Sequence, residues 1–224
     1  MVGLGIRKRR RAVEAETVER FRALPVANVS DVMSRMSAGG ARLRPLHAGG
    51  GMAGPALTVR TRPGDNLMVH KALDLAEPGD VVVVDAGGDL TNALIGELMI
   101  TYAMTRRLAG IVINGAVRDL GYIRAGAFPV FAAGVTHRGP YKDGPGEINV
   151  PIALEGMVIE PGDLIIGDDD GLLCVPYDAA ASVYEAAAAK QDAERRQMAA
   201  IQAGTSDRSW VDQTLSRIGC PIEE

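Results

Sequence analysis

Residues 111–119, with the sequence IVINGAVRD, run from a wholly apolar segment through a glycine into an adjacent arginine and aspartate. So apolar a segment predicts a strand that is covered on both faces, as in the parallel sheets of α/β proteins. The end of such a strand is a rigid place to hold charge. Arg118 offers a planar pair of donors to a carboxylate, and Asp119 offers hard oxygens to a divalent cation. The pair indicates a site for an anionic, metal-bound substrate, and a surface ion pair at the start of a helix is the alternative.

Strands and helices are expected to alternate on the N-terminal side of this stretch. Pro25 ends the first predicted helix, and Ser30 is expected to cap the second. This alternation predicts an α/β layered core. The expected strands cover 56–61, 81–85 and 111–114, and the expected helices cover 12–24, 30–36, 65–76 and 92–108.

The C-terminal half is expected to contain short strands and turns, followed by helices. The sequence Glu-Pro-Gly-Asp precedes a core strand twice, at 77–80 and at 160–163. It suits a type II turn, in which proline fixes the first central φ and glycine supplies the positive φ of the second. Glycine and proline in 136–149 predict a loop near a binding surface. The other expected strands cover 130–133, 158–159, 164–166 and 172–175, and the expected helices cover 178–203 and 210–218.

The composition limits the class of protein. With 224 residues, of which 47% are hydrophobic and only 4% aromatic, the chain can bury one substantial core of aliphatic side chains. A net charge of -4 argues against a nucleic-acid coat or a basic membrane surface. Two cysteines without a paired spacing, and the lack of a membrane-spanning or signal-peptide pattern, lead us to expect a soluble, cytoplasmic protein. The basic run at 7–11 is expected to be a solvated tail rather than a nucleic-acid arm.

Several common chemistries are poorly supported by the sequence. The strand at 81–85 and the glycines at 87 and 88 look like the nucleotide loop of a Rossmann methyltransferase or dehydrogenase, but a third glycine and a ribose-binding acid are missing. These glycines are better suited to letting backbone amides approach an anion. No zinc-binding spacing and no serine-hydrolase elbow occurs. His70 and Lys71 could face a ligand, although a solvated helix face is the favoured interpretation.

A second candidate segment, LIGEL at 94–98, lies in the helix predicted over 92–108. Glycine lowers the stability of a helix, so its presence at position 96 indicates that another group approaches the backbone closely there. Glu97 has apolar neighbours on both sides, and alone it is best explained as a carboxylate on the helix surface. It becomes a candidate catalytic residue only when it is considered together with the Arg-Asp pair.

These two segments resemble those of the RraA-like family. The family includes class II 4-hydroxy-4-methyl-2-oxoglutarate/4-carboxy-4-hydroxy-2-oxoadipate aldolases, members labelled demethylmenaquinone methyltransferases, and members that inhibit ribonuclease E. The resemblance implies a layered β/β/α swivelling-type α/β domain over 26–177, with an N-terminal basic tail and helix over 1–25 and a C-terminal helical extension over 178–224. It rests on Gly96-Glu97-Leu98, Gly115-Ala116-Val117-Arg118-Asp119, Asn28-Val29-Ser30-Asp31 and Gly64-Asp65-Asn66.

For the aldolases, the resemblance implies a role for each candidate residue. Asp119 would ligate Mg²⁺ or Mn²⁺, and Arg118 would bind the substrate and stabilise the pyruvate enolate. Backbone amides around Gly96, Glu97 and Leu98 would hold the pyruvyl carboxylate, and Glu97 would orient a water for proton transfer. Retro-aldol cleavage and oxaloacetate decarboxylation both pass through an enolate, so both need this charge stabilisation. The resemblance also implies a homotrimer or a dimer of trimers (a homohexamer), with sites between subunits.

One position departs from the aldolase pattern, which has an acidic residue where this sequence has Tyr122. An acidic group there would help to hold metal-bound water. The inhibitor members usually lack the metal-binding aspartate, so Asp119 favours an enzyme. We therefore expect a divalent-metal-dependent lyase that acts on a small 2-oxo dicarboxylate, without a nucleic-acid or membrane partner. The alternative is a non-catalytic, protein-binding ring of the ribonuclease E inhibitor type.

Overall fold

Strand β6 (Gly110–Val117) lies in the middle of the main sheet, and all 8 of its residues are buried. It pairs in parallel with β4 (Val81–Asp85) and β7 (Val130–Val135), and its C-terminal end pairs with the short strand β5 (Ala93–Ile95). The structure is a computed structural model that describes residues 3–221. Burial along the whole of β6 confirms the expected parallel strand covered on both faces.

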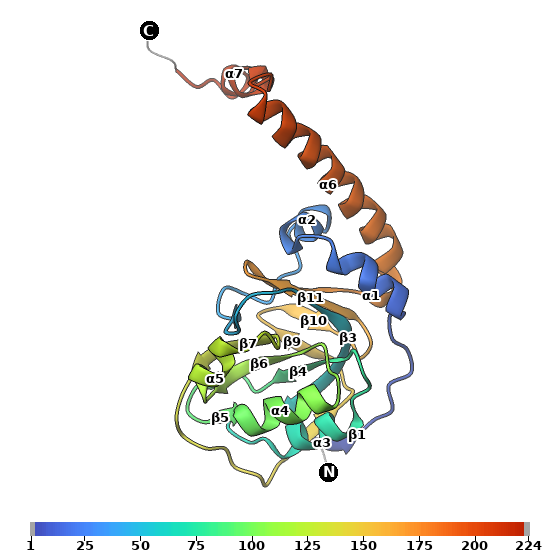
Figure 1. The fold of residues 1–224 in the computed structure, drawn as a ribbon, viewed down its shortest axis with the longest axis vertical. Coiled ribbons are helices and arrows are strands. Elements are labelled where there is room, and N and C mark those ends of the chain that lie inside the picture. Colours follow the sequence, from blue (N-terminus) through green and yellow to red (C-terminus); the bar gives the residue numbers. More distant parts are fainter. Residues whose placement is uncertain (1–2, 222–224) are drawn as a thin grey trace. The chain divides into compact units, whose positions relative to one another are not determined.

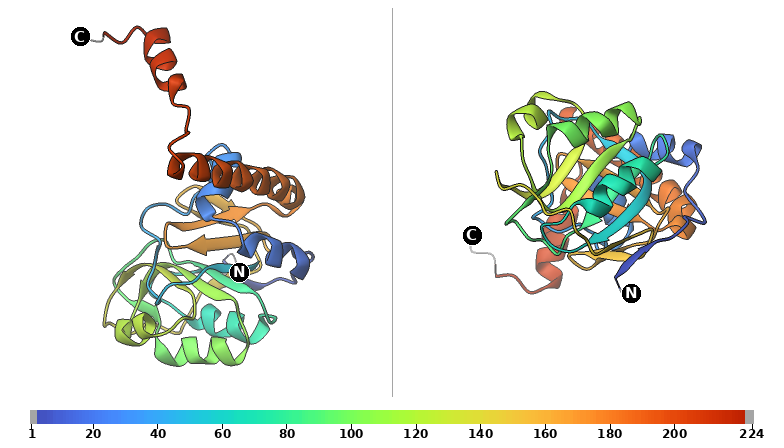
Figure 2. Two further views of the ribbon diagram at one scale, coloured as in Figure 1. Left: turned by 45° about the horizontal axis from the view of Figure 1, so that its top comes forward. Right: turned by 90° about the horizontal axis from the view of Figure 1, so that it is seen from below.

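The first compact unit of the chain, Met1–Ala187, is built in layers around this sheet. Figure 1 shows α3, α4 and α5 on one side of the β4-β6-β7 sheet and β9 to β12 on the other, and Figure 2 shows the helices covering the sheet when it is seen from below. Apolar side chains from the helices and the sheet form one buried cluster. This arrangement confirms the predicted layered α/β fold. The elements are α3 (Leu67–Leu75), α4 (Glu97–Thr105), α5 (Leu120–Ala125), β9 (Ile152–Leu154), β10 (Met157–Ile159), β11 (Leu164–Asp168) and β12 (Gly171–Val175).

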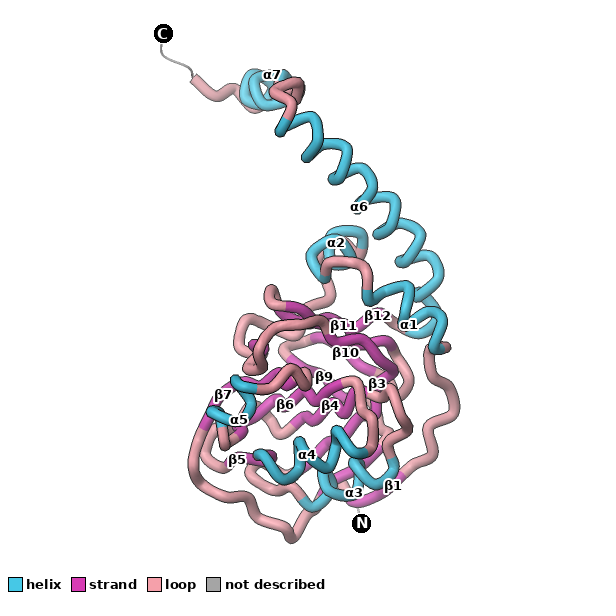
Figure 3. Tube along the Cα trace, in the orientation of Figure 1, coloured by secondary structure: helices cyan, strands magenta, loops and turns pink. Residues whose placement is uncertain are grey.

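Strand β3 (Met52–Thr61) joins the two strand layers because its two halves have different partners. Its N-terminal half runs antiparallel to β11, and its C-terminal half runs parallel to β4 and antiparallel to β8 (Gly146–Ile148). The sheet order is β1-β8-β3-β4-β6-β7-β2, with β1 (Leu4–Ile6) and β2 (Arg44–Pro45) at the two edges. The long strand can be followed in Figure 3, where strands are magenta.

The two Glu-Pro-Gly-Asp turns have the predicted geometry. The φ angle is +91° at Gly79 and +92° at Gly162, in a region that glycine adopts without steric cost. In the first turn the Asp80 carboxylate accepts a hydrogen bond from the backbone N–H of Glu77 at 2.8 Å, and the second turn has the same bond at 2.9 Å. Both aspartates are buried. Their carboxylates therefore close the turns, which the turn sequence alone did not reveal.

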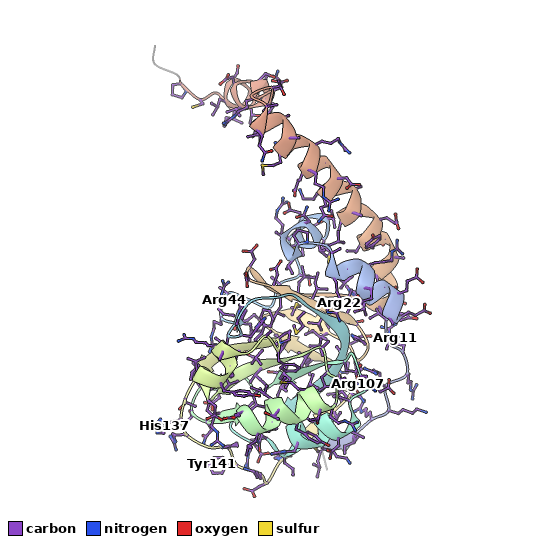
Figure 4. The ribbon with its side chains drawn as sticks, in the orientation of Figure 1. Arg11, Arg22, Arg44, Arg107, His137 and Tyr141 are labelled. Atoms are coloured by element: carbon purple, nitrogen blue, oxygen red, sulfur yellow. The ribbon has the colours of Figure 1, made fainter. Side chains whose placement is uncertain are left out.

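The basic run at 7–11 is not a solvated tail, so that prediction is wrong. Strand β1 pairs with β8 just before it, and two of its arginines bind the two repeated turns. Arg9 lies 2.7 Å from the Asp80 carboxylate of the first turn, and its side chain is only 13% exposed. Arg11, which is labelled in Figure 4, lies 2.7 Å from the Glu160 carboxylate of the second turn. The run therefore ties the N-terminal segment to the core.

Replacing Arg9 by alanine should lower the free energy of unfolding by about 2–4 kcal/mol at pH 7, because the buried Asp80 carboxylate loses its counter-charge. Burial raises the pKa of Asp80 above its ordinary value, and Arg9 opposes this rise. A raised pKa in the folded state means that Asp80 favours folding when it is protonated, and this contribution is lost as the pH rises through the folded-state pKa. The effect of Arg9→Ala should therefore become smaller as the pH falls below that pKa.

Urea unfolding followed by circular dichroism at several pH values measures this difference. The matched control is Arg10→Ala, because Arg10 is exposed and makes no ion pair with the residues that the structure describes. Equal losses of stability in the two variants, or a loss that does not change with pH, would contradict the assignment of Arg9 as the partner of Asp80.

The first two helices differ from the prediction in where the second one begins. Helix α1 (Ala15–Arg22) ends before Pro25, and α2 (Val26–Val32) begins directly after it. Ser30 was expected to cap the second helix, but it lies inside α2. A proline suits the start of a helix because no helical hydrogen bond needs its missing N–H there.

Two other boundaries are corrected by strand pairing. The helix predicted over 92–108 begins only at Glu97, because the apolar residues just before it form β5 against β6. The loop predicted over 136–149 includes β8 near its end, where the chain pairs with both β1 and β3. In both places a long-range partner overrides the local pattern.

The second compact unit, Ala188–Glu224, is helical. Helix α6 (Ala180–Gln202) follows a short 3₁₀ turn, η1 (Tyr177–Ala179), and continues into this unit, which also contains α7 (Ser209–Arg217). Both helices were predicted. Between residues 3 and 221, no helix combines the length and the apolar character needed to cross a membrane.

Candidate active site

Strand β5 brings the two candidate segments together. It pairs with the last two residues of β6, and the backbone N–H of Arg118 donates a hydrogen bond to the carbonyl of Ile95 at 3.0 Å. Gly96 is the next residue after β5, and it therefore lies beside Arg118 and Asp119. The sequence predicted the two segments separately, and the sheet places them next to each other.

The Asp119 carboxylate links these segments. Its Oδ2 atom accepts a hydrogen bond from the backbone N–H of Glu97 at 2.9 Å and lies 3.7 Å from Nε of Arg118. Its Oδ1 atom accepts no hydrogen bond from the described part of the chain. The Arg118 and Asp119 side chains are 44% and 41% exposed, and an ion pair this exposed contributes little to stability. The surface ion pair is present, but stability does not explain its position.

Asp119 has a left-handed backbone conformation, with φ 58° and ψ 41°, at the start of α5. A non-glycine residue pays a free-energy cost in this region, although the cost is smaller for aspartate and asparagine. The Asp119 side chain does not cap α5 and instead contacts the start of α4. Backbone strain that aims a carboxylate at another helix is typical of a functional position.

Gly96 is required for space and not for its backbone conformation. Its φ of -157° is extended and open to any residue. A Cβ atom built on Gly96 would collide with the Asp119 carboxylate and would lie 2.9 Å from Cγ of Arg118. The missing side chain lets the charged pair approach the first turn of α4. The amides of Leu98 and Met99 in that turn have no acceptor within the helix, so an anion is favoured there.

A cavity of about 160 Å³ opens beside Gly96 and Arg118. It is small beside the roughly 300–1,000 Å³ of typical drug-sized sites, and this size suits a small metabolite. Among the predicted site residues, Gly96, Leu98 and Arg118 line the cavity, whereas Glu97 and Asp119 do not. The Glu97 carboxylate is exposed and has no hydrogen-bond or ion-pair partner within residues 3–221. Its role in proton transfer therefore stays a prediction.

Tyr122 occupies the position at which the aldolase pattern has an acidic residue. Its hydroxyl lies 2.9 Å from Oγ1 of Thr101 in α4, and its ring packs against the buried cluster. The side chain is therefore engaged with α4, and its position gives no acidic group to hold water near Asp119.

The donor set at Asp119 fits a hydrated divalent cation. The described residues contain no group of three or more His, Cys, Asp or Glu side chains that could enclose a metal ion. Asp119 offers one carboxylate oxygen that is free of hydrogen bonds and partly exposed to water. Mg²⁺ is commonly bound through one or two carboxylates, keeps several waters and accepts oxygens of the substrate. The residues therefore suit an open metal site that is completed by water and substrate.

Three further residues that were not predicted as part of the site line the same cavity: Asn66, His70 and Lys142. The solvated helix face favoured for His70 and Lys71 is confirmed, because both side chains are exposed, but His70 also lines the cavity, whereas Lys71 lies outside it. Partial removal from water lowers the pKa of His70, and the positive charge of Lys142 lowers it further. The sequence had offered His70 as a residue that could face a ligand, and Lys142 lies in the loop predicted near a binding surface, but neither residue was assigned to this site.

Both segments of the candidate site lie within the part of the chain that matches a family of known proteins. A family model described as "RraA-like: Aldolase/RraA" matches residues 26–174. A protein of Halalkalibacterium halodurans with the provisional name of a 4-hydroxy-4-methyl-2-oxoglutarate aldolase is 38% identical over 203 residues, which cover 90% of this chain and 97% of that protein.

Two solved structures are similar in fold. An uncharacterised protein from Pseudomonas syringae pv. tomato has a TM-score of 0.78 at 25% identity, and the match covers 87% of this chain and 96% of that chain. The RNA-processing inhibitor RraA from Thermus thermophilus has a TM-score of 0.63 at 32% identity, with 68% and 92% covered. The similar proteins thus include one with the name of an aldolase and one with the name of an RNA-processing inhibitor.

Proposed function

This chain belongs to the RraA-like family, and from that premise we propose that it is an aldolase-type lyase that cleaves a small 2-oxo dicarboxylate and releases pyruvate. The aldolase names of relatives support the lyase class. The observation that carries the proposal is the meeting of Arg118 and Asp119 with the first turn of α4, beside a small cavity.

The reaction breaks the C3–C4 bond of a 4-hydroxy-2-oxo acid. The 4-hydroxyl group loses its proton and becomes the carbonyl of one product, and the electron pair of the broken bond forms the enolate of pyruvate. Loss of CO₂ from oxaloacetate forms the same enolate. In both reactions negative charge develops on the 2-oxo oxygen, and a proton added at C3 completes pyruvate. The site must therefore bind a carboxylate, stabilise an oxyanion and move a proton.

The residues of this chain divide these tasks among them. The pyruvyl carboxylate would lie at the free amides of the first turn of α4, next to Gly96. The guanidinium of Arg118 would donate hydrogen bonds to the 2-oxo oxygen as its charge grows. Glu97 would orient the water that exchanges the proton at C3. Asp119 would hold Mg²⁺ or Mn²⁺, and the chemistry supplied by that ion is Lewis-acid polarisation of the 2-oxo oxygen.

Pyruvate release tests this function. Purified protein with Mg²⁺ or Mn²⁺ should form pyruvate from 4-hydroxy-4-methyl-2-oxoglutarate or oxaloacetate, measured with a coupled lactate dehydrogenase assay. Removal of the metal with a chelator should abolish turnover, and added Mg²⁺ should restore it. The absence of pyruvate from both substrates in the presence of either metal would contradict the lyase function.

A second candidate function is a non-catalytic, protein-binding ring. It is favoured by the similarity to an RNA-processing inhibitor and by Tyr122, which occupies the acidic position of the aldolase pattern. It predicts no turnover of any 2-oxo acid, and a protein partner whose binding survives chelation. Both candidate functions are proposed for a homotrimer or a dimer of trimers.

A further inference from the structure

The cavity beside Gly96 and Arg118 has a second cationic group, which comes from a different part of the chain. Lys142 lines it from the loop that precedes β8, and His70 lines it from α3. No carboxylate occurs among the described residues of the lining. Arg118 has the Asp119 carboxylate 3.7 Å from its Nε atom, just outside the lining, whereas Lys142 has no ion-pair partner among the described residues. The charge of Lys142 therefore favours a ligand with a second negative group. The carboxylate at the pyruvyl end of the ligand would lie near Arg118 and would leave the positive charge of Lys142 without a partner.

The backbone around Lys142 is fixed by hydrogen bonds to the segment that ends at Asn66. The N–H of Tyr141 donates to the carbonyl of Gly64 at 2.9 Å, and the N–H of Asn66 donates to the carbonyl of Tyr141 at 3.0 Å. Tyr141 is labelled in Figure 4 on the loop that carries Lys142. Lys142 therefore extends from a loop whose position is set before any ligand arrives, and this lowers the entropy cost of binding.

Asp65 holds the other side of this loop. Its carboxylate is fully buried and accepts hydrogen bonds from the backbone N–H groups of Asp143 at 2.7 Å and Gly144 at 2.9 Å. It also accepts the N–H of Leu67 at 2.9 Å, at the start of α3. One buried carboxylate thus connects the loop of Lys142 to the helix of His70. Asp65 is a positioning residue for both.

Asn66 and His70 supply neutral polar groups beside these charges. The Asn66 side-chain amide donates to the carbonyl of Leu94 at 2.7 Å, and its Oδ1 atom is buried without a hydrogen-bond partner in the described residues. An acceptor in that state costs free energy unless a donor reaches it. Partial burial and Lys142 lower the pKa of His70, although Asp74 opposes this, and the shift favours the neutral ring, which can donate or accept a single hydrogen bond.

We propose that Lys142, assisted by His70, binds the second carboxylate of a dicarboxylic 2-oxo acid whose pyruvyl end lies at Gly96 and Arg118. This inference rests on the proposed function, and it names the residues that select a dicarboxylate over a monocarboxylate. Lys142 is a specificity residue, and the enolate chemistry does not require it.

Titration calorimetry with two matched ligands tests the inference without turnover. 2-Oxoglutarate and 2-oxopentanoate share the pyruvyl end and the chain length, and they differ in the second carboxylate. With Mg²⁺ present, Lys142→Gln should weaken 2-oxoglutarate binding by about 10-fold, as expected for one charged hydrogen bond at an exposed side chain. Binding of 2-oxopentanoate should not change. Lys142→Arg should restore most of the lost affinity, because it restores the charge.

The control is Lys71→Gln, because Lys71 is exposed on α3 beside His70 and lies outside the cavity. Equal affinity of the wild-type protein for the two ligands would overturn the inference, and so would a Lys142→Gln effect that is the same for both or absent for both. If 2-oxoglutarate binds through Lys142 but no substrate is cleaved, the proposed lyase function fails and the dicarboxylate site stands. Failure of both ligands to bind the wild-type protein would contradict both proposals.

Discussion

Asp119→Asn should lower kcat for pyruvate release by roughly 10²–10³ while the fold is kept. Asparagine tolerates the left-handed backbone of this position, whereas alanine would add strain. Its amide oxygen can still accept the hydrogen bond from the N–H of Glu97, so the contact between the two segments is preserved. Only the negative charge that a cation needs is lost. Rates are measured with the coupled pyruvate assay at saturating Mg²⁺.

The control for this variant is Asp169→Asn, in the turn between β11 and β12, where the Asp169 side chain is exposed. It should keep the wild-type rate. Thermal unfolding of both variants should match that of the wild-type protein. A wild-type rate in Asp119→Asn would show that Asp119 does not hold the catalytic metal, and the open metal site would then have to be abandoned.

Arg118→Met should lower kcat by roughly 10²–10³, because the guanidinium acts on charge that appears only as the enolate forms. Methionine keeps much of the length of the side chain and removes its charge and its donors. Arg118 is 44% exposed, and its only ion pair within residues 3–221 is the partly exposed one with Asp119, so little stability should be lost. Steady-state kinetics and thermal unfolding together separate these effects.

Arg124→Met is the matched control for Arg118→Met. Arg124 is an exposed arginine in the last turn of α5, and it has no ion-pair partner among the described residues. This variant should keep the wild-type kcat. An Arg118→Met variant with a raised KM and an unchanged kcat would mean that Arg118 only binds the substrate, and the assignment of enolate stabilisation to it would be wrong.

The central strand and its charged end could be predicted because their signals are local. The apolar run before Gly115 marks a strand buried on both faces, and the change to Arg118 and Asp119 marks where it leaves the core. The loss of helix stability that a glycine at position 96 would cause indicated that another group approaches the backbone there. The collision expected for a side chain on Gly96 gives the physical reason.

Other features depend on partners far along the chain and have no local signal. Arg9 belongs to a basic run typical of a solvated tail, but its partner Asp80 lies 71 residues away. Lys142 lies in a loop rich in glycine and proline. This loop lies at the cavity because its Asp143 N–H donates a hydrogen bond to Asp65, which is 78 residues earlier in the sequence. The left-handed conformation of Asp119 likewise accompanies a contact of its carboxylate with α4, which has no local signal in the sequence.

A crystal structure of the protein soaked with Mn²⁺ and pyruvate is the most direct test of the proposed site. The predicted result is an anomalous peak for manganese beside the Asp119 carboxylate, with the pyruvate carboxylate at the first turn of α4 and its 2-oxo oxygen near Arg118. Pyruvate bound in the cavity without a cation at Asp119, or a cation bound elsewhere with Asp119 still held only by the N–H of Glu97, would contradict the account.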